Sequence, residues 1–88
     1  MKVYTLTYDT ETEFGTELHQ SLATLWYSAM AWSEKVMGTE SAREQRIRII
    51  EDIPECDNPE LEAAKVLLKA VEEEAEVWAI FRIQEFEL

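Results

Sequence analysis

Apolar and polar residues alternate near both ends of the chain. Close to the start, Tyr4, Leu6 and Tyr8 share one face of an extended segment, and from residue 77 onward Phe81 and Ile83 again share one face. A repeat of two residues is the pattern of a β-strand. The sequence therefore predicts a strand at each end of the chain.

Between these strands the apolar residues recur at spacings of three and four, which is the pattern of an amphipathic helix. The first predicted helix begins near Thr16, whose hydroxyl suits an N-cap, and ends near Met37, because Gly38 favours the left-handed conformation that commonly follows a helix. Its apolar face covers about half of the circumference, more than the roughly 100° that a surface helix needs. We therefore expect other elements to pack on two sides of it.

Two shorter helices are predicted to follow. Ser41 opens a capping box, so the second helix begins there, turns Ile47 and Ile50 inward and ends before Pro54. The third helix begins after Asn58, because a proline at the first helical position follows this N-cap residue.

The order of the predicted elements is β-α-α-α-β, which indicates an α+β fold in one small domain spanning residues 1–88. We expect the terminal strands to pair and the helices to pack on the small sheet that they form. The first half of the last strand is apolar on both sides, so both sides should be covered, by helices of this chain or by a second copy. Because two strands alone make a marginal sheet, a homodimer is one of the expected states.

Charge narrows the range of partners. The chain of 88 residues has 19 acidic and 8 basic side chains and a net charge of −11. Nucleic acid and anionic membranes repel such a surface, so neither is expected to bind directly. No apolar run approaches the ~20 residues that cross a bilayer. The first residues lack the pattern of a signal peptide, and a single cysteine excludes an internal disulfide. These features favour a cytoplasmic protein.

Catalytic and cofactor motifs are not found. The two glycines, Gly15 and Gly38, lie in no phosphate-binding frame, and the carboxylates that follow the first strand do not continue into a calcium loop. His19 and Cys56 fall in different predicted elements and have no flanking nucleophile motif. We therefore expect a protein that is not an enzyme and that carries neither a cofactor nor a metal ion.

Two groups of carboxylates are the candidate binding residues. One group lies at the end of the third predicted helix, and the other spans the connector after the first strand and the start of the first helix. Both have a plain explanation, which is solubility. A sharper one is that carboxylates about 5 to 6 Å apart on a helix imitate a row of phosphates and occupy a basic nucleic-acid-binding surface on another protein. The groups are Glu72, Glu73, Glu74 and Glu76, and Asp9, Glu11, Glu13 and Glu17.

Two aromatic residues of the first helix complete the candidate partner-binding site. Trp26 widens the apolar face, and Tyr27 falls on the polar side, where we expect the most exposed aromatic ring. Such residues often anchor protein interfaces.

The leading hypothesis is a small acidic inhibitor or decoy that blocks a nucleic-acid-handling protein. By analogy of size and charge, it would be a nucleic-acid mimic of the kind that bacterial viruses use against host defences. The alternative is a non-catalytic structural or regulatory interaction module, homodimeric, whose acidic residues serve only solubility.

Overall fold

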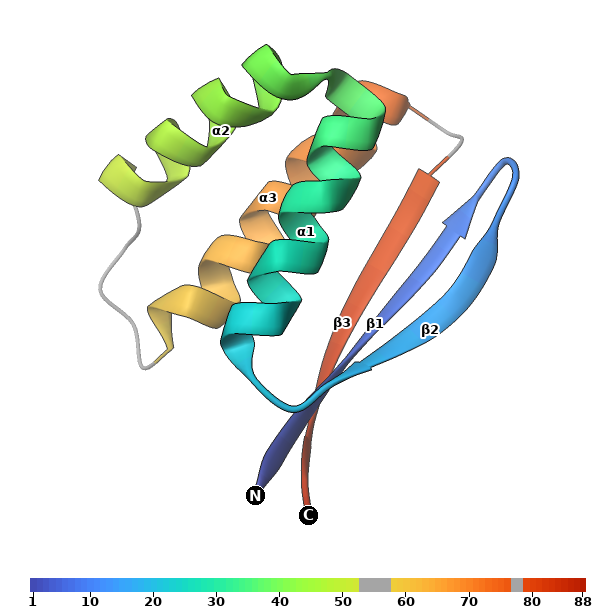
Figure 1. Ribbon diagram of the computed structural model, residues 1–88, viewed down its shortest axis with the longest axis vertical. Helices are drawn as coiled ribbons and strands as arrows, with labels where there is room; N and C mark the ends of the chain where they lie inside the picture. Colours follow the sequence, from blue (N-terminus) through green and yellow to red (C-terminus); the bar gives the residue numbers. More distant parts are fainter. Residues whose placement is uncertain (53–57, 77–78) are drawn as a thin grey trace.

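Six elements make up the described part of the chain, which comprises residues 1–52, 58–76 and 79–88 of this computed structural model. In chain order they are β1 (Lys2–Thr10), β2 (Phe14–His19), α1 (Leu22–Met37), α2 (Thr39–Asp52), α3 (Pro59–Ala75) and β3 (Ala79–Glu87). Figure 1 shows the strands side by side and the three helices together on one side of them. The predicted α+β class is confirmed.

The sheet is antiparallel, with β1 in the middle and the strand order β2-β1-β3. β1 and β3 pair along their whole length, from Lys2 opposite Glu87 to Thr10 opposite Ala79, so the predicted pairing of the terminal strands is confirmed. The short strand β2 is an addition to the predicted order. It forms a hairpin with β1, closed by a hydrogen bond of 2.7 Å from the Thr10 amide to the Glu13 carbonyl.

The prediction that a helix begins near Thr16 is wrong. Thr16 and Leu18 belong to β2 and pair with β1, and α1 begins at Leu22. The N-cap of α1 is Ser21, whose hydroxyl accepts a hydrogen bond of 3.2 Å from the Thr24 amide. Pairing with β1 prevails over the helical spacing of the leucines because tertiary contacts outweigh local propensity.

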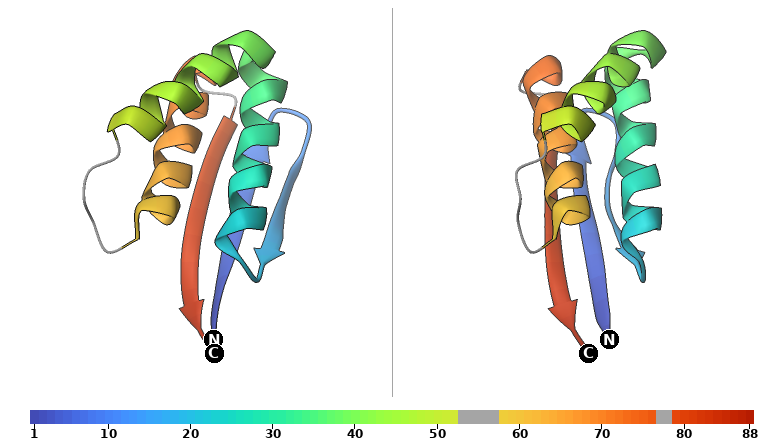
Figure 2. Two further views of the ribbon diagram at one scale, coloured as in Figure 1. Left: turned by 60° about the vertical axis from the view of Figure 1, so that its left-hand side comes forward. Right: turned by 90° about the vertical axis from the view of Figure 1, so that its left-hand side faces the viewer.

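The molecule has three layers. α1 and α3 pack side by side against one face of the sheet, and α2 lies across the outer side of this helix pair (Figures 1 and 2). Within the described residues, α2 contacts these two helices but no strand. The core between the sheet and the helix pair holds Leu6, Leu25, Leu67 and Val71, all 0% exposed. Burial of each such side chain stabilises the fold by about 1.5 to 3 kcal/mol.

α2 differs from its prediction in both its start and its inward face. It begins at Thr39 rather than at Ser41. Ile49 is the isoleucine that it buries, whereas Ile47 and Ile50 are 50% and 64% exposed. A helix that contacts only two other helices, from their outer side, buries a narrow stripe, so one isoleucine is covered and its neighbours on the wheel are not.

The ends of α1 and α3 follow the prediction. Gly38 ends α1 with a φ of 86°, a conformation that glycine adopts without steric cost. Asn58 caps α3 by accepting a hydrogen bond of 3.4 Å from the Leu61 amide, and Pro59 is the first residue of that helix. The predicted stop at Pro54 lies outside the described residues.

The two faces of the sheet differ in what covers them. On the face toward the helices, Trp32 of α1 packs between Tyr8 and Phe81, with ring centroids 4.9 and 5.2 Å apart. On the opposite face, which we call the open face, none of the three described helices lies, and Ile80 of β3 is 58% exposed there. Helices of this chain therefore cover only one of the two apolar sides of the last strand.

Candidate protein-binding surfaces

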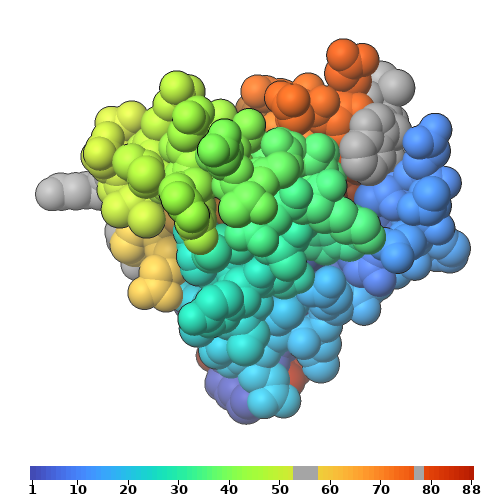
Figure 3. Space-filling view, turned by 45° about the horizontal axis from the view of Figure 1, so that its top comes forward, coloured from blue at the N-terminus to red at the C-terminus, as the bar shows by residue number. Residues whose placement is uncertain are grey.

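Carboxylates from three separate segments meet at one end of the molecule. The segments are the turn between β1 and β2, the junction of α1 and α2, and the last turn and C-cap of α3. Figure 3 shows these segments on one face, in blue, green and orange. All seven carboxylate residues are exposed. We call them the acidic end: Glu11, Glu13, Glu34, Glu40, Glu73, Glu74 and Glu76.

Two contacts hold this end together. Thr10 pairs with Ala79 in the sheet, so the turn after β1 and the chain entering β3 lie at the same end. Lys35 Nζ lies 2.9 Å from Glu13 Oε2 and so links that turn to the last turn of α1. The ion pair is exposed and therefore worth at most about 1 kcal/mol. The pair therefore shows that the turn and α1 are adjacent, and it adds little stability.

Glu72, a predicted partner-binding residue, faces the sheet instead of the acidic end. Its Oε1 accepts a hydrogen bond from the Phe81 amide, at 2.6 Å. Asp9 is exposed, but the alternation of β1 places it on the open face, at the border of the acidic end. The remaining residues of the two predicted groups, apart from Glu17, lie within the acidic end.

Glu17 is engaged inside the fold. Its Oε1 lies 2.7 Å from His19 Nε2 and accepts a hydrogen bond of 2.5 Å from the Ser28 hydroxyl. His19 Nδ1 lies 3.0 Å from Thr24 Oγ1. This network joins β2 to the first half of α1.

The side chains of this network follow one another in the order hydroxyl, imidazole and carboxylate, as in a catalytic triad, through Thr24, His19 and Glu17. The Thr24 hydroxyl is also hydrogen bonded to the Ser21 carbonyl, at 3.1 Å, as part of the cap of α1. A catalytic triad needs a hollow beside the nucleophile for the reacting group. None of the three hollows described below is lined by Thr24 or His19.

Trp26 and Tyr27 line an apolar groove where the first half of α1 meets α2 and α3. Its volume is about 570 Å³, and among the described residues that line it Glu60 is the one with a charge. Tyr27 is 69% exposed, as expected for a ring on the polar side of α1, although Phe14 at 84% is the more exposed aromatic residue. The exposure of Phe14 was not predicted, because this residue belongs to β2, the strand that was not predicted.

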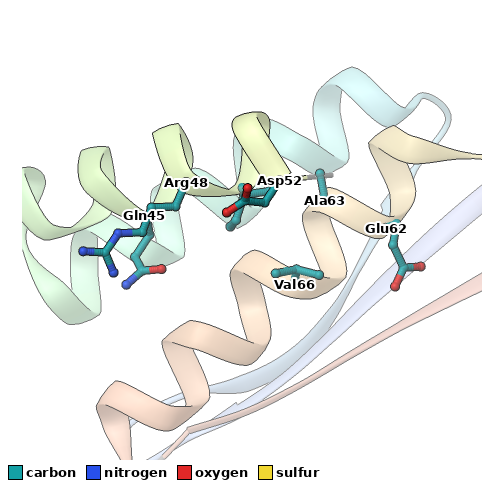
Figure 4. Close-up of a pocket in the computed structure, with 7 residues that line it drawn as sticks. Gln45, Arg48, Asp52, Glu62, Ala63 and Val66 are labelled. Atoms are coloured by element: carbon teal, nitrogen blue, oxygen red, sulfur yellow. The ribbon is translucent and has the colours of Figure 1, made fainter. Parts of the chain in front are cut away.

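Two smaller hollows lie elsewhere on the described surface. One, of about 240 Å³, lies between α2 and α3, and Figure 4 shows Arg48 and Glu62 at its opposite ends, pointing away from one another. The other, of about 290 Å³, lies between α3 and β3 and includes Lys65 and Lys69. Small-molecule sites bring a few polar groups to one point. The hollow in Figure 4 lacks that arrangement.

Among the described residues, no group of three or more His, Cys, Asp or Glu side chains is placed to hold a metal ion. No helix in that part of the chain is long and apolar enough to cross a membrane. Cys56 lies outside the described residues. Compared with known proteins, the chain matches no family model, no curated protein and no solved structure. Its function must therefore be argued from its surfaces.

Proposed function

We propose that this protein is a small, non-catalytic inhibitor or decoy that binds a basic, nucleic-acid-binding surface of another protein through its acidic end. The observation that carries the proposal is that three segments, which together bear seven exposed carboxylates, lie on one face of the molecule. Such a concentration of one charge steers a basic partner to one place on the molecule.

The position of these carboxylates on α3 favours a binding role over solubility alone. The C-terminal end of a helix carries a partial negative charge, so an acidic side chain there costs about 0.3 to 1 kcal/mol of stability. Glu73 and Glu74 lie in the last turn of α3, Glu76 is its C-cap residue, and no basic residue accompanies them in that turn. Solubility can be supplied by carboxylates elsewhere on the surface without that cost.

The test is affinity capture of a tagged protein from a nuclease-treated lysate of its source, with elution by stepped salt and identification by mass spectrometry. We expect a basic nucleic-acid-binding protein that is released as salt rises from about 50 to 500 mM, because screening weakens exposed charge pairs. The triple variant Glu73→Gln, Glu74→Gln, Glu76→Gln should lose this partner.

A matched control carries the same change of net charge away from the acidic end: Glu51→Gln, Glu60→Gln, Glu62→Gln, three residues that are also exposed. It should retain the partner. Equal loss of the partner by both triple variants would show that net charge alone governs capture, and the proposal would then be rejected.

A second candidate is a non-catalytic interaction module that holds an apolar segment of a partner protein in the groove beside Trp26 and Tyr27. The apolar lining of this 570 Å³ groove, in which Glu60 is the one charged side chain that the structure describes, favours it. Capture by this route would resist salt, because apolar burial strengthens rather than weakens as salt rises. It would be lost in Tyr27→Ala and kept in the triple glutamine variant of the acidic end.

A further inference from the structure

The exposed apolar residues of this chain are concentrated on the open face of the sheet. The register places Phe14 and Leu18 of β2 and Ile80 and Phe86 of β3 on that face, and their exposed fractions are 84%, 65%, 58% and 45%. Met1 and Leu88 continue the β1–β3 ladder through mutual hydrogen bonds of 3.1 and 2.7 Å and are exposed too. Of the ten large hydrophobic residues that are exposed in the described part of the chain, six thus belong to one surface.

The open face is also electrically neutral, although the chain has a net charge of −11. Its charged strand residues are Asp9 of β1 and Arg82 of β3, one of each sign. The carboxylates of the acidic end lie on the turn and helices instead. Two copies of so acidic a chain repel one another over most of their surface, and at the open face they meet without stacking carboxylate on carboxylate.

We propose that the open face binds a second copy of this chain, so that two three-stranded sheets pack face to face. This goes beyond the proposed function, because it needs no residue of the acidic end. β1 is the central strand, so a two-fold axis lying in the plane between the sheets sets β1 on β1. With this axis perpendicular to the strands, Thr5 meets Thr7 of the second copy and Asp9 lies over Val3 rather than over another Asp9. The apolar edge strands β2 and β3 then each meet their own copies, as an isologous interface allows.

The size of the face sets the expected affinity. Three strands of up to nine residues span about 30 by 14 Å, or roughly 400 Å² per copy. A standard stable interface uses about 800 Å² per partner. We therefore expect a reversible dimer with a Kd of about 10 to 100 µM rather than an obligate one.

Sedimentation velocity of the full chain from about 1 µM to about 1 mM tests the proposal. We expect a monomer–dimer equilibrium within this range that tightens with added salt, because salt screens the repulsion between two acidic copies. Phe14→Thr and Ile80→Thr keep strand propensity and should each weaken the dimer about tenfold. Tyr27→Gln, which removes an equally exposed ring from the helix layer, should leave it unchanged.

In a second pair of variants, both members change the net charge by the same amount, but one change lies on the open face and the other lies elsewhere. Arg82→Glu places two like charges on the open face and should abolish the dimer, whereas Arg43→Glu on the exposed side of α2 should not. The amide shifts that change with concentration should map to β1, β2 and β3, and the same spectra show whether each variant is folded. A monomer at all concentrations, or a dimer lost through Tyr27→Gln and kept in Arg82→Glu, overturns the proposal.

Discussion

The carboxylate of Glu72 accepts a hydrogen bond from the backbone amide of Phe81, with 2.6 Å between Oε1 and N. Phe81 lies in β3, an edge strand whose only neighbour in the described sheet is β1. A free edge donor invites pairing with another chain. Glu72 occupies one such donor and joins the end of α3 to the start of β3.

Removal of this carboxylate should therefore weaken the junction of α3 and β3. We expect Glu72→Ala to lower the free energy of unfolding by about 1 to 2 kcal/mol, since a hydrogen bond to a charged group is lost at a half-buried site. Urea denaturation measures the loss, and hydrogen exchange at the Phe81 amide should accelerate in parallel. The exposed neighbour Glu74→Ala should lose no stability and gain up to about 1 kcal/mol, because it removes a carboxylate from the negative end of the helix. Similar losses in both variants would mean that the hydrogen bond contributes little.

Gly15 is needed because Tyr8 lies over it. A Cβ atom at position 15 would stand 2.8 Å from the Tyr8 hydroxyl oxygen, and Tyr8 in turn packs on Trp32. Overpacking costs about 1 to 3 kcal/mol, and the lower entropy of the unfolded chain returns about 0.4 to 1 kcal/mol. Gly15→Ala should thus destabilise the protein by about 1 kcal/mol in thermal or urea unfolding, more than Thr16→Ala at the next, exposed position. A stabilised Gly15→Ala would contradict this packing.

The sequence predicts the strands at the two ends and the whole of α3, because their apolar residues face the core with a regular period. β2 was not predicted, because its apolar and polar residues lie on the faces opposite to those of a strand that packs its apolar side on a core. Its apolar Phe14 and Leu18 point to the open face, whereas Glu17 and His19 point toward the helices, where they form hydrogen bonds. The sequence does contain one sign of where α1 begins. Ser21 is a good N-cap residue, and in the structure its hydroxyl accepts a hydrogen bond from the Thr24 amide.

The acidic end is a tertiary feature, and no local pattern contains it. Its groups come together because β1 and β3 pair with Thr10 opposite Ala79. A shift of register would move the turn away from the end of α3. Glu34 and Glu40 join the end only because Gly38 separates α1 from α2 at this point. The side-chain role of Glu72 likewise depends on the position of Phe81, nine residues later.

Lys2 and Glu85 form a pair between β1 and β3, with 3.3 Å from Nζ to Oε1. Two effects of Glu85 raise the pKa of Lys2 above its ordinary value of 10.5. The larger is the hydrogen bond between the two side chains, and the second is the negative charge of the Glu85 carboxylate. A pKa raised by folding gives a contribution to stability that is complete below 10.5 and is lost as pH rises through the folded-state pKa. The pair should therefore weaken only in strongly alkaline solution.

An NMR titration of the Lys2 side chain checks this direction. In Glu85→Gln the pKa of Lys2 should fall back toward 10.5, while Glu62→Gln on α3 should leave it unchanged. No change in Glu85→Gln would assign the raised pKa of Lys2 to another carboxylate, such as Glu87, whose charge also raises it.

Glu76 ends α3 with φ 64° and ψ −106°, a backbone conformation that residues with a Cβ atom rarely adopt. Such strain costs on the order of 1 to 3 kcal/mol, and glycine avoids it. Glu76→Gly should therefore raise the free energy of unfolding by about 1 kcal/mol, after the greater entropy of an unfolded glycine is subtracted. Glu74→Gly is the matched control, because it also removes one carboxylate from the C-terminal end of α3. Position 74 is helical, however, and there glycine costs about 1 kcal/mol. Urea denaturation of the two variants should show changes of opposite sign, and destabilisation by both would mean that the conformation at position 76 is not strained.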